Sequence, residues 1–412
     1  MSSVVISGDT SGTVTLQVPA VAGTTTLTLP ATSGTVLTSA SGQSLVSPAI
    51  TGTPTISGVA FGPYTMKKRI INGAMLFDQR NAGVTVNNVA GNVYTLDRWQ
   101  ANGDQASKFS VYQNANSAAS YSATGQYYSM GITSLSSYSV PSGEGYIIRQ
   151  RIEGYNIQDL AWGTANAKTV TLSFQVYCSL SGTFGGVITN SANNRSYPFS
   201  YTISSANTWT TISVTIPGDT TGTWLTTNGV GIQIFFGLGV GSTLSGTAGA
   251  WAGASYYSAT GATSIVGTNG ATWYITGVQL EVGSTATAFE WRPYGQELFL
   301  CERYFQIFAN TVIDNTSCIC TATAIDTSNL IGMVNLHTPM RGQPSLVTTA
   351  TQFRANLGTV NANSTTAPTV TQNSDISLRF NQGGYAAGLT ADKSGILRFN
   401  GGTGYCAASA EL

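Results

Sequence analysis

The stretch Thr169-Val-Thr-Leu-Ser-Phe-Gln-Val-Tyr177 alternates apolar and polar side chains along its whole length. Val170, Leu172, Phe174 and Val176 occupy every second position, and Thr, Ser and Gln lie between them. Because successive side chains of a β-strand point to opposite faces, this pattern predicts a strand with one buried and one polar face. A sheet with one solvated face is typical of antiparallel structure.

Seven further runs have strand character, and Gly, Asn and Ser separate them. In the run 208–216, Ile212, Val214 and Ile216 alternate with Thr211, Ser213 and Thr215. Trp209 occupies the same side as these polar residues. No helix-length amphipathic segment interrupts the runs. The chain is therefore predicted to be all-β, with two antiparallel sheets packed as a jelly-roll sandwich over residues 66–292. The eight runs are 108–113, 127–133, 145–152, 169–177, 197–204, 208–216, 230–237 and 272–282.

After Pro293 the spacing of apolar residues changes from every second residue to every third or fourth residue. Leu298, Cys301, Phe305 and Phe308 are spaced by three, four and three residues, which predicts a helical turn or two that bridges domains. Short strands then return, and we expect a smaller C-terminal β domain over residues 293–412 that serves as a distal, trimerising part. Its predicted strands are 318–325, 331–336, 376–380 and 396–399.

The first 65 residues contain one charged side chain, Asp9, and a strand-like repeat. The unit Gly-Thr-Val-Thr-Leu-Gln-Val-Pro-Ala starts at Gly12, and Gly-Thr-Thr-Thr-Leu-Thr-Leu-Pro-Ala starts at Gly23. Two or three such strands bury little apolar surface, so we expect other copies of the chain to complete a β stalk. A disordered Thr/Ser/Gly linker is the alternative. The basic run Lys67-Lys68-Arg69 marks a boundary near residue 65.

The composition argues against several classes of partner. Charged residues make up 8% of the chain, and 17 basic residues balance 17 acidic ones, so no net field favours nucleic acid or an anionic membrane. No apolar run approaches the roughly 18 residues of a membrane span. The five cysteines have no paired metal spacing. We expect them, including Cys318 and Cys320 on one strand face, to be small buried apolar residues.

Several motifs of the sequence resemble those of a known class of proteins. They are the stalk repeat and Ser47-Pro-Ala-Ile-Thr-Gly-Thr-Pro-Thr-Ile-Ser-Gly58, then Asn72-Gly-Ala-Met-Leu-Phe-Asp-Gln-Arg80, Tyr94-Thr-Leu-Asp-Arg-Trp99, Val278-Gln-Leu-Glu-Val-Gly283, Ala288-Phe-Glu-Trp-Arg-Pro-Tyr294, Leu300-Cys-Glu-Arg-Tyr-Phe305 and Ala410-Glu-Leu412. Together they resemble bacteriophage tail-fibre and related virion proteins that contain carbohydrate-binding-like jelly rolls.

The resemblance implies a virion fibre subunit, commonly a homotrimer, whose lectin-like domain attaches to a glycan of the host surface. Residues 1–65 would then join the fibre to a tail or head adaptor protein. The Met-Ser-Ser-Val start shows no secretory signal, so we expect synthesis in the host cytoplasm and residence in the virion. Two alternatives stay open: a purely structural head fibre, collar or decoration protein, and a glycan depolymerase tailspike.

The sequence shows little catalytic chemistry. The single histidine, His337, has no Gly-x-Ser-x-Gly elbow and no second histidine to work with, which argues against a triad or a zinc site. Glycan hydrolysis requires two facing carboxylates, and the sequence pairs none of its candidates. We therefore expect no enzyme activity and no cofactor, with structural calcium left open. The candidate carboxylates are Asp78, Asp97, Asp104, Glu144, Glu153 and Asp159.

Glycan recognition calls for flat aromatic faces on loops over a rigid scaffold. The loop 238–271 contains Trp251, Tyr256 and Tyr257, and the turn 222–227 contains Trp224, so we predict these four as the glycan-binding residues. The alternative is that they plug the sheet ends or face a neighbouring subunit. Trp162, Trp209 and Trp273 lie on or beside strands and are expected in the core.

Overall fold

The computed structural model describes residues 68–310, 318–385, 388–400 and 404–412, and the backbone of four short strands before them. The chain divides into two compact units, Met1–Pro63 and Tyr64–Leu412. In the first unit, β1 (Ser3–Ser7) pairs antiparallel with β2 (Thr13–Gln17), and β3 (Thr55–Ile56) pairs with β4 (Val59–Ala60). Strand β2 coincides with the first sequence repeat, whereas the second repeat, from Gly23, lies outside the described residues.

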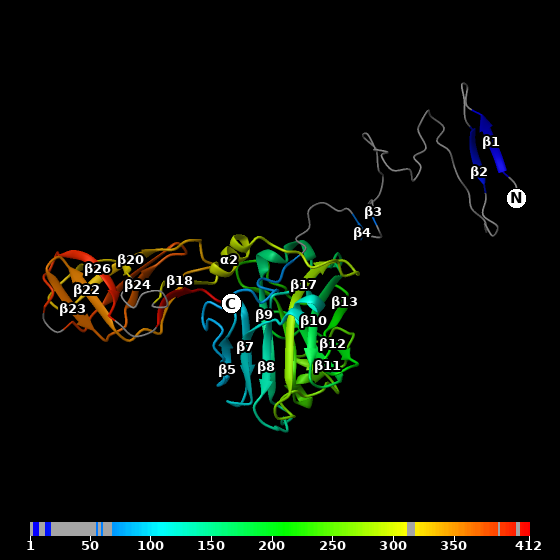
Figure 1. Cartoon of the computed structure of the whole chain (residues 1–412), viewed down its shortest axis with the longest axis horizontal. Helices are drawn as coiled ribbons and strands as arrows, with labels where there is room; N and C mark the ends of the chain where they lie inside the picture. The colour runs from blue at the N-terminus through cyan, green and yellow to red at the C-terminus, as the bar shows by residue number, and fades with distance from the viewer. Residues whose placement is uncertain are drawn as a thin grey trace. The chain divides into compact units, whose positions relative to one another are not determined.

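The second unit begins with two antiparallel sheets (Figure 1). The five-stranded sheet has the order β13-β10-β17-β8-β7, and the six-stranded sheet has the order β12-β11-β14-β9-β6-β5. The predicted all-β sandwich is therefore confirmed. The strands are β5 (Gly91–Tyr94), β6 (Trp99–Gly103), β7 (Phe109–Ala115), β8 (Tyr128–Ser134), β9 (Gly145–Glu153), β10 (Val170–Cys178), β11 (Gly182–Thr189), β12 (Ser196–Ile203), β13 (Thr210–Ile216), β14 (Val230–Val240) and β17 (Thr272–Val282).

The core lies between these two sheets. Phe236 of β14 sits at its centre, with the rings of Trp99, Phe174, Phe199 and Trp273 at centroid distances of 5.1 to 6.3 Å. All five side chains are nearly or fully inaccessible to solvent. Burying a side chain of this size contributes about 1.5–3 kcal/mol, so this cluster fixes both sheets in register. The alternation read in β10 holds, because Val170, Leu172, Phe174 and Val176 all face this core.

All eight predicted runs coincide with strands, but β5, β6 and β11 were not predicted. Strand β11 contains three glycines, and Gly185 lies under β16 (Ser258–Ala259). A Cβ at Gly185 would lie 2.4 Å from Ser258 Oγ and 2.6 Å from the backbone nitrogen of Ala259. Gly237 of β14 also approaches Ser258 closely. The glycines thus let a second layer of chain lie directly on the sheet, a requirement that comes from tertiary packing rather than from strand propensity.

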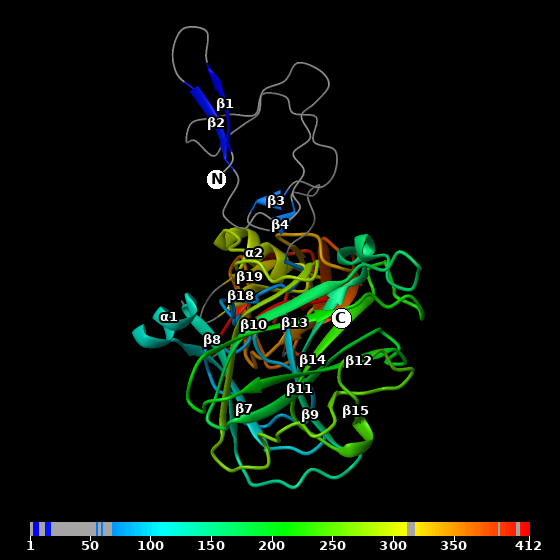
Figure 2. The same cartoon turned by 90° about the vertical axis from the view of Figure 1, so that its right-hand side faces the viewer.

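Short elements complete the sandwich. The 3-10 turns η1 (Gly154–Asn156) and η2 (Gln158–Leu160) follow β9, and η3 (Ser242–Leu244), β15 (Ser245–Gly246) and β16 belong to the long loop after β14. The helix α1 (Ala118–Thr124) connects β7 to β8 and lies beside the end of β8 (Figure 2).

The structure contains the predicted bridging helix, but the helix ends earlier than expected. It forms α2 (Tyr294–Glu302), and the chain then enters the strand β18 (Phe305–Asn310). Phe305 and Phe308 therefore lie on a strand, so the helix prediction was wrong beyond Glu302. Strand β18 pairs with β27 (Tyr405–Ser409), and that tertiary pairing overrides the local helical spacing.

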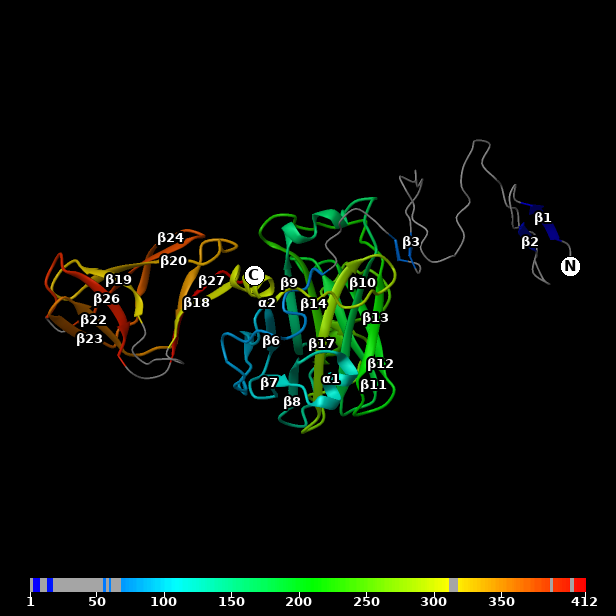
Figure 3. The same ribbon diagram turned by 45° about the horizontal axis from the view of Figure 1, so that its top comes forward.

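The C-terminal part contains two further antiparallel sheets. One has the order β18-β27-β21, and the other has the order β23-β22-β26-β19-β20-β25-β24 (Figure 3). A separate core, which includes Phe353, Leu397 and Phe399, lies on one side of the larger sheet. The remaining strands are β19 (Cys318–Ala324), β20 (Leu330–Asn335), β21 (Ser345–Thr348), β22 (Phe353–Leu357), β23 (Val360–Ser364), β24 (Thr369–Asn373), β25 (Ser377–Gln382) and β26 (Ser394–Phe399).

A β-bulge between Cys318 and Cys320 corrects one expectation. Cys320 is buried as predicted, but the bulge reverses the alternation, so Cys318 is exposed. Cys178, Cys301 and Cys406 are buried.

The residues after β27 return to the sandwich. Glu411 forms ion pairs with Arg98 and Arg80, and the Tyr94 hydroxyl donates to the backbone oxygen of Leu412 at 2.8 Å. On the other side of the junction, Arg303 donates to Glu153 from Nη2 at 2.6 Å and from Nε at 2.9 Å. Charge-assisted pairs of this bidentate kind are strong and geometrically specific.

Candidate functional site

Two of the four predicted glycan-binding residues belong to an aromatic cluster at one end of the sandwich. Trp224 is 7% exposed and packs edge-on against Trp162 at 4.7 Å and Trp251 at 5.5 Å. Its indole N–H donates to Asp219 and to the backbone of Thr221, and the indole of Trp251 donates to the backbone oxygen of Pro217. The rings thus close the end of the core, which is the role named above as the alternative.

Tyr256 and Tyr257 lie elsewhere, on the outer face of the six-stranded sheet. Together with Val240 they pack on three buried side chains of that face, Ile147, Val187 and Phe235. The ring of Tyr257 meets Phe235 edge-on at 5.3 Å. The four predicted residues therefore do not form one site, and a glycan contact by any of them stays a prediction.

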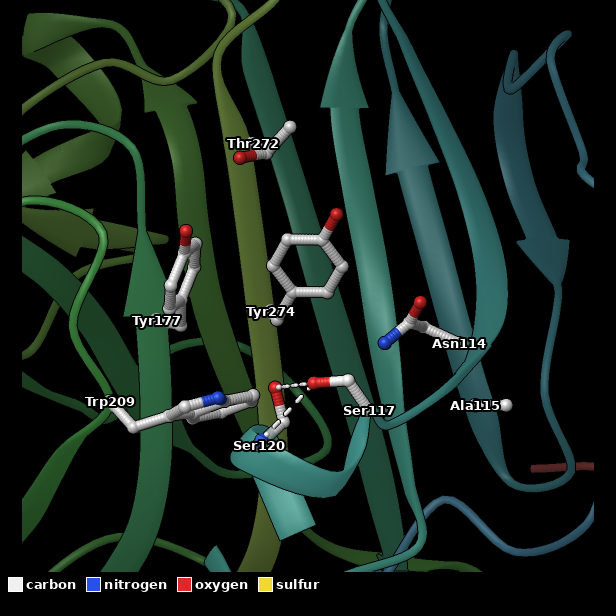
Figure 4. A pocket seen from close by; sticks show the side chains of 8 residues that line it. All are labelled: Asn114, Ala115, Ser117, Ser120, Tyr177, Trp209, Thr272 and Tyr274. Carbon is white, nitrogen blue, oxygen red and sulfur yellow. Dashed lines mark hydrogen bonds between the residues drawn. The ribbon is translucent and has the colours of Figure 1, made fainter. Parts of the chain in front are cut away.

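A groove of about 300 Å³ lies on the outer face of the five-stranded sheet. Its aromatic side chains come from three neighbouring strands: Tyr177 from β10, Trp209 from the residue before β13, and Tyr274 from β17. All three are partly exposed. The remaining lining residues are Asn114, Ala115, Ser117, Ser120 and Thr272 (Figure 4).

The three rings support one another. Tyr177 contacts Trp209 at 5.8 Å and Tyr274 at 5.5 Å, and the Tyr177 and Tyr274 planes are nearly perpendicular at 77°. In Figure 4 the ring of Tyr274 is seen face-on, to the right of the more edge-on rings of Tyr177 and Trp209. The groove thus has one flat ring at its base and two rings along its side.

Hydrogen bonds hold the rings in place from outside the groove. The hydroxyls of Tyr112 and Tyr274 are 2.9 Å apart, and the Tyr177 hydroxyl donates to Asn207 Oδ1 at 3.1 Å. Gly131 makes room for Tyr112, because a Cβ there would lie 2.6 Å from its ring. Burial raises the pKa of Tyr274, and the hydrogen bond with Tyr112 raises it further. Tyr274 is therefore neutral at physiological pH.

The polar groups of the groove are hydroxyls and amides. Asn114 donates to Asn116 and Ser129, which orients its side chain along β7. Among the described residues, no acceptor receives the indole N–H of Trp209. No charged side chain lines the groove. Flat apolar rings beside uncharged donors and acceptors suit a neutral polyhydroxylated ligand.

The expectation that Trp209 belongs to the core was therefore wrong, whereas Trp162 and Trp273 are buried as predicted. A sequence signal for the groove was present. Trp209 shares its parity with Thr211 and Ser213 rather than with Ile212, and Tyr177 shares its parity with Ser173 and Gln175. An aromatic residue on the polar side of an alternating strand points away from the core.

The candidate carboxylates do not form a hydrolytic site of the expected kind. Asp97 is 1% exposed, and although burial raises its pKa to about 6, both of its oxygens accept hydrogen bonds from Gln79. Glu153 is occupied by Arg303, and Asp159 by Arg69. None of these three lines the aromatic groove.

The other candidates serve local structure. Asp78 accepts the backbone N–H groups of Asn81 and Gly83, and Asp104 accepts that of Gly145. Burial alone raises the pKa of Glu144, but hydrogen bonds from the Tyr138 and Tyr146 hydroxyls bring it below its ordinary value. A glycosidase general acid needs a raised pKa instead, so Glu144 is unsuited to that role.

The side chains of the motif Asp97-Arg98-Trp99 have separate partners. Trp99 is fully buried, and the Arg98 guanidinium stacks on the ring of Tyr304 at 3.5 Å and pairs with Glu411. In the described part of the chain, no three His, Cys, Asp or Glu side chains gather as a metal site would require. No helix there is long and apolar enough to cross a membrane.

Comparisons with known proteins give a fold-level likeness only. No family model matches the chain, and no curated protein matches it. Among solved structures, the chain is similar to the enzymatically active domain of tailspike protein 4 from bacteriophage CBA120, with a TM-score of 0.27 and 10% identity over 52% of this chain. The match spans 21% of the length of that tailspike chain.

Two carbohydrate-binding modules are also similar. One is the family 11 module from Clostridium thermocellum bound to a β-1,3-1,4-mixed-linked tetrasaccharide, with a TM-score of 0.24 and 10% identity over 50% of this chain and 97% of that one. The other is TmCBM61 bound to β-1,4-galactotriose, with a TM-score of 0.24 and 12% identity over 45% of this chain and 88% of that one. At this level of likeness we draw no conclusion about ligand or activity.

Proposed function

We propose that the sandwich domain binds a neutral glycan through the groove formed by Tyr177, Trp209 and Tyr274. The observation that carries this proposal is the position of three partly exposed aromatic rings on an otherwise polar sheet face. Isolated exposed rings are common, but three rings around one groove, with Tyr177 in contact with both of the others, form a preorganised surface. Because the rings rest on strands and on one another, binding requires little ordering of side chains.

The chemistry of the groove favours a sugar over other ligands. A pyranose ring presents an apolar face that packs on an aromatic ring, and its hydroxyls require donors and acceptors at the edge. Asn114, Ser117, Ser120 and Thr272 supply such groups. The absence of charged residues from the groove lining disfavours a phosphate or carboxylate ligand at this position.

The sequence motifs resemble those of phage fibre proteins, so the proposed setting is a virion. In this proposal the chain is a homotrimeric fibre subunit, residues 1–65 join it to a tail or head adaptor protein, and the groove attaches the particle to a host surface polysaccharide. The domain over residues 293–412 would be distal and would trimerise. The protein would act without catalysis.

A binding comparison of full-length variants tests the groove. Trp209→Ala should weaken binding to a recognised bacterial polysaccharide at least tenfold, which corresponds to about 1.4 kcal/mol. Trp291→Ala is the matched control, because Trp291 is 55% exposed and lies outside the groove. Equal affinity of Trp209→Ala and the unaltered chain would contradict the proposal.

Two other outcomes separate the alternative functions. A chain that binds no polysaccharide on a bacterial glycan array, and does not block phage adsorption, would be a structural virion component. Shortening of a host polysaccharide during incubation with the protein would identify a depolymerase. Removal of residues 1–65 should leave the sandwich folded yet prevent incorporation into particles, and normal incorporation would contradict the assigned anchor.

A further inference from the structure

Two arginines face each other on the outer side of the seven-stranded sheet. Arg354 of β22 and Arg398 of β26 are direct cross-strand partners in an antiparallel pair. Their neighbours Phe353, Leu397 and Phe399 point into the core, so both arginines lie on the opposite face. Side chains at such positions have Cβ atoms about 4.5–5.5 Å apart, and like charges there destabilise the sheet.

Among the described residues, amide side chains accept and extend the hydrogen bonds of this pair, and the exposed Cys318 is the other cross-strand partner of Arg398. Arg398 Nε donates to Asn356 Oδ1 at 2.9 Å, and Asn356 Nδ2 donates to Asn361 Oδ1 at 2.5 Å. The Nε of Arg354 is shielded from solvent and has no hydrogen-bond partner. Within the described ranges, neither guanidinium lies within 4.0 Å of a carboxylate.

Three arginines of the sandwich and its junction have a carboxylate partner. Arg303 pairs with Glu153, Arg195 pairs bidentately with Asp219, and Arg98 pairs with Glu411. A buried or half-buried donor without an acceptor costs about 1–3 kcal/mol. The pair Arg354 and Arg398 therefore combines like-charge repulsion with an unsatisfied donor, and an external anion would relieve both.

The same face continues into a groove of about 370 Å³. Three hydroxyl residues line it, Thr321, Thr323 and Ser394. The other lining residues are Ala322, Ile331, Gly332, Met333 and Arg379. Ser394 and Arg398 lie on one strand, about 13 Å apart at the usual rise of a strand. A chain-like ligand that follows β26 would meet the arginine pair and then the hydroxyl-lined groove.

We propose that Arg354 and Arg398 bind the carboxylate of an acidic polysaccharide that contains uronic acid residues. A guanidinium presents parallel N–H donors that match a carboxylate, and two opposed guanidinium groups can share one such group. The amides of Asn356 and Asn361 lie where the hydroxyls of the same sugar would need partners. Nucleic acid is disfavoured, because no aromatic side chain of the described strands lies on this face for base stacking.

The site is independent of the aromatic groove, so the two can fail separately. The test uses the full-length chain and polygalacturonate as the probe, with the same polymer after reduction of its carboxylates to alcohols as the matched ligand. Biolayer interferometry at low salt should show binding of polygalacturonate and at least tenfold weaker binding of the reduced polymer. Raised salt should weaken the first interaction and leave the second nearly unchanged.

Three variants assign the effect to the pair. Arg354→Gln with Arg398→Gln should lower polygalacturonate affinity at least tenfold. Lys393→Gln removes the same charge from the turn before β26 and should change affinity less than twofold, and Trp209→Ala should bind this polymer as the unaltered chain does. Arg398→Gln alone should keep or raise the melting temperature, because it removes like-charge repulsion.

Four results would overturn the proposal. The first two are that polygalacturonate does not bind at low salt, or that the reduced polymer binds equally well. The third is that the double glutamine variant keeps both its affinity and its melting temperature. The fourth is that a single-stranded DNA oligomer binds more tightly at the same pair. Loss of binding in Trp209→Ala but not in the double variant would assign the acidic polymer to the aromatic groove instead.

Discussion

The two sheets of the sandwich share one core but have different outer faces. On the six-stranded sheet, the long loop after β14 lies on the strands, and Tyr256 and Tyr257 help to bury Phe235. On the five-stranded sheet, Tyr177, Trp209 and Tyr274 remain partly exposed around a groove. Both sets of rings are partly exposed. The loop aromatics cover a buried ring of their own sheet, whereas the strand aromatics line a groove.

The largest difference between the faces should appear when an aromatic ring is removed. Phe235→Ala on the covered face should lower the free energy of unfolding by about 3–5 kcal/mol, because the ring is fully buried and the cavity cannot collapse completely. Urea unfolding measures this change. Tyr177→Ala on the open face is the control and should cost about 1 kcal/mol. Equal losses would mean that the open face is buried in solution.

Glycine substitutions should distinguish the faces next. Gly185→Ala places a methyl group 2.6 Å from the backbone nitrogen of Ala259, so strand β16 has to move, at a cost of about 2–3 kcal/mol. Thermal unfolding detects the loss. Protease cleavage within the loop should also become faster in this variant. An unchanged melting temperature would show that β16 does not pack on β11.

The corresponding change on the open face should be smaller. Gly131→Ala meets the Tyr112 ring, which can swing toward solvent, so the main cost is the Tyr112–Tyr274 hydrogen bond, about 1 kcal/mol. The same displacement should alter glycan affinity several-fold. Tyr112→Phe removes the hydroxyl and keeps the ring, so a similar loss in that variant identifies the hydrogen bond as the cause.

The smallest effect on stability is expected at the residue with the largest expected effect on binding. Trp209→Ala should change the free energy of unfolding by less than about 1 kcal/mol, because the ring is partly exposed and lies outside the core. Urea unfolding beside a glycan titration measures both quantities on one sample. A destabilisation above about 3 kcal/mol would show that Trp209 has a structural role instead.

The sequence predicted the strands better than the site. The alternation in β10 is local, so it identified the buried side chains without any tertiary information. Gly185 could not be interpreted in this way, because its role depends on β16, more than 70 positions further along the chain. The bulge at Cys318 likewise arises from pairing with β26.

Part of the groove could be predicted from the sequence. The parity of Trp209 and Tyr177 places both on the polar side of their strands, but the core was predicted for Trp209 because it lies beside a strand. That β10, β13 and β17 bring these residues together follows only from the sheet order. Trp251 is partly exposed, as its loop position suggested, but its contacts with Trp162 and Tyr197 follow only from tertiary packing.

The return of residues 410–412 to the sandwich has a consequence for proteolysis. The C-terminal sheets are joined to the sandwich at two places, through Arg303 and Glu153 after α2, and through Glu411 with Arg80 and Arg98. After a single cut at the exposed turn that follows Leu357, the ion pairs of Glu411 with Arg80 and Arg98 and the pairing of β18 with β27 would still connect the two fragments. The nicked protein should therefore elute as one species and separate into two fragments only in denaturant.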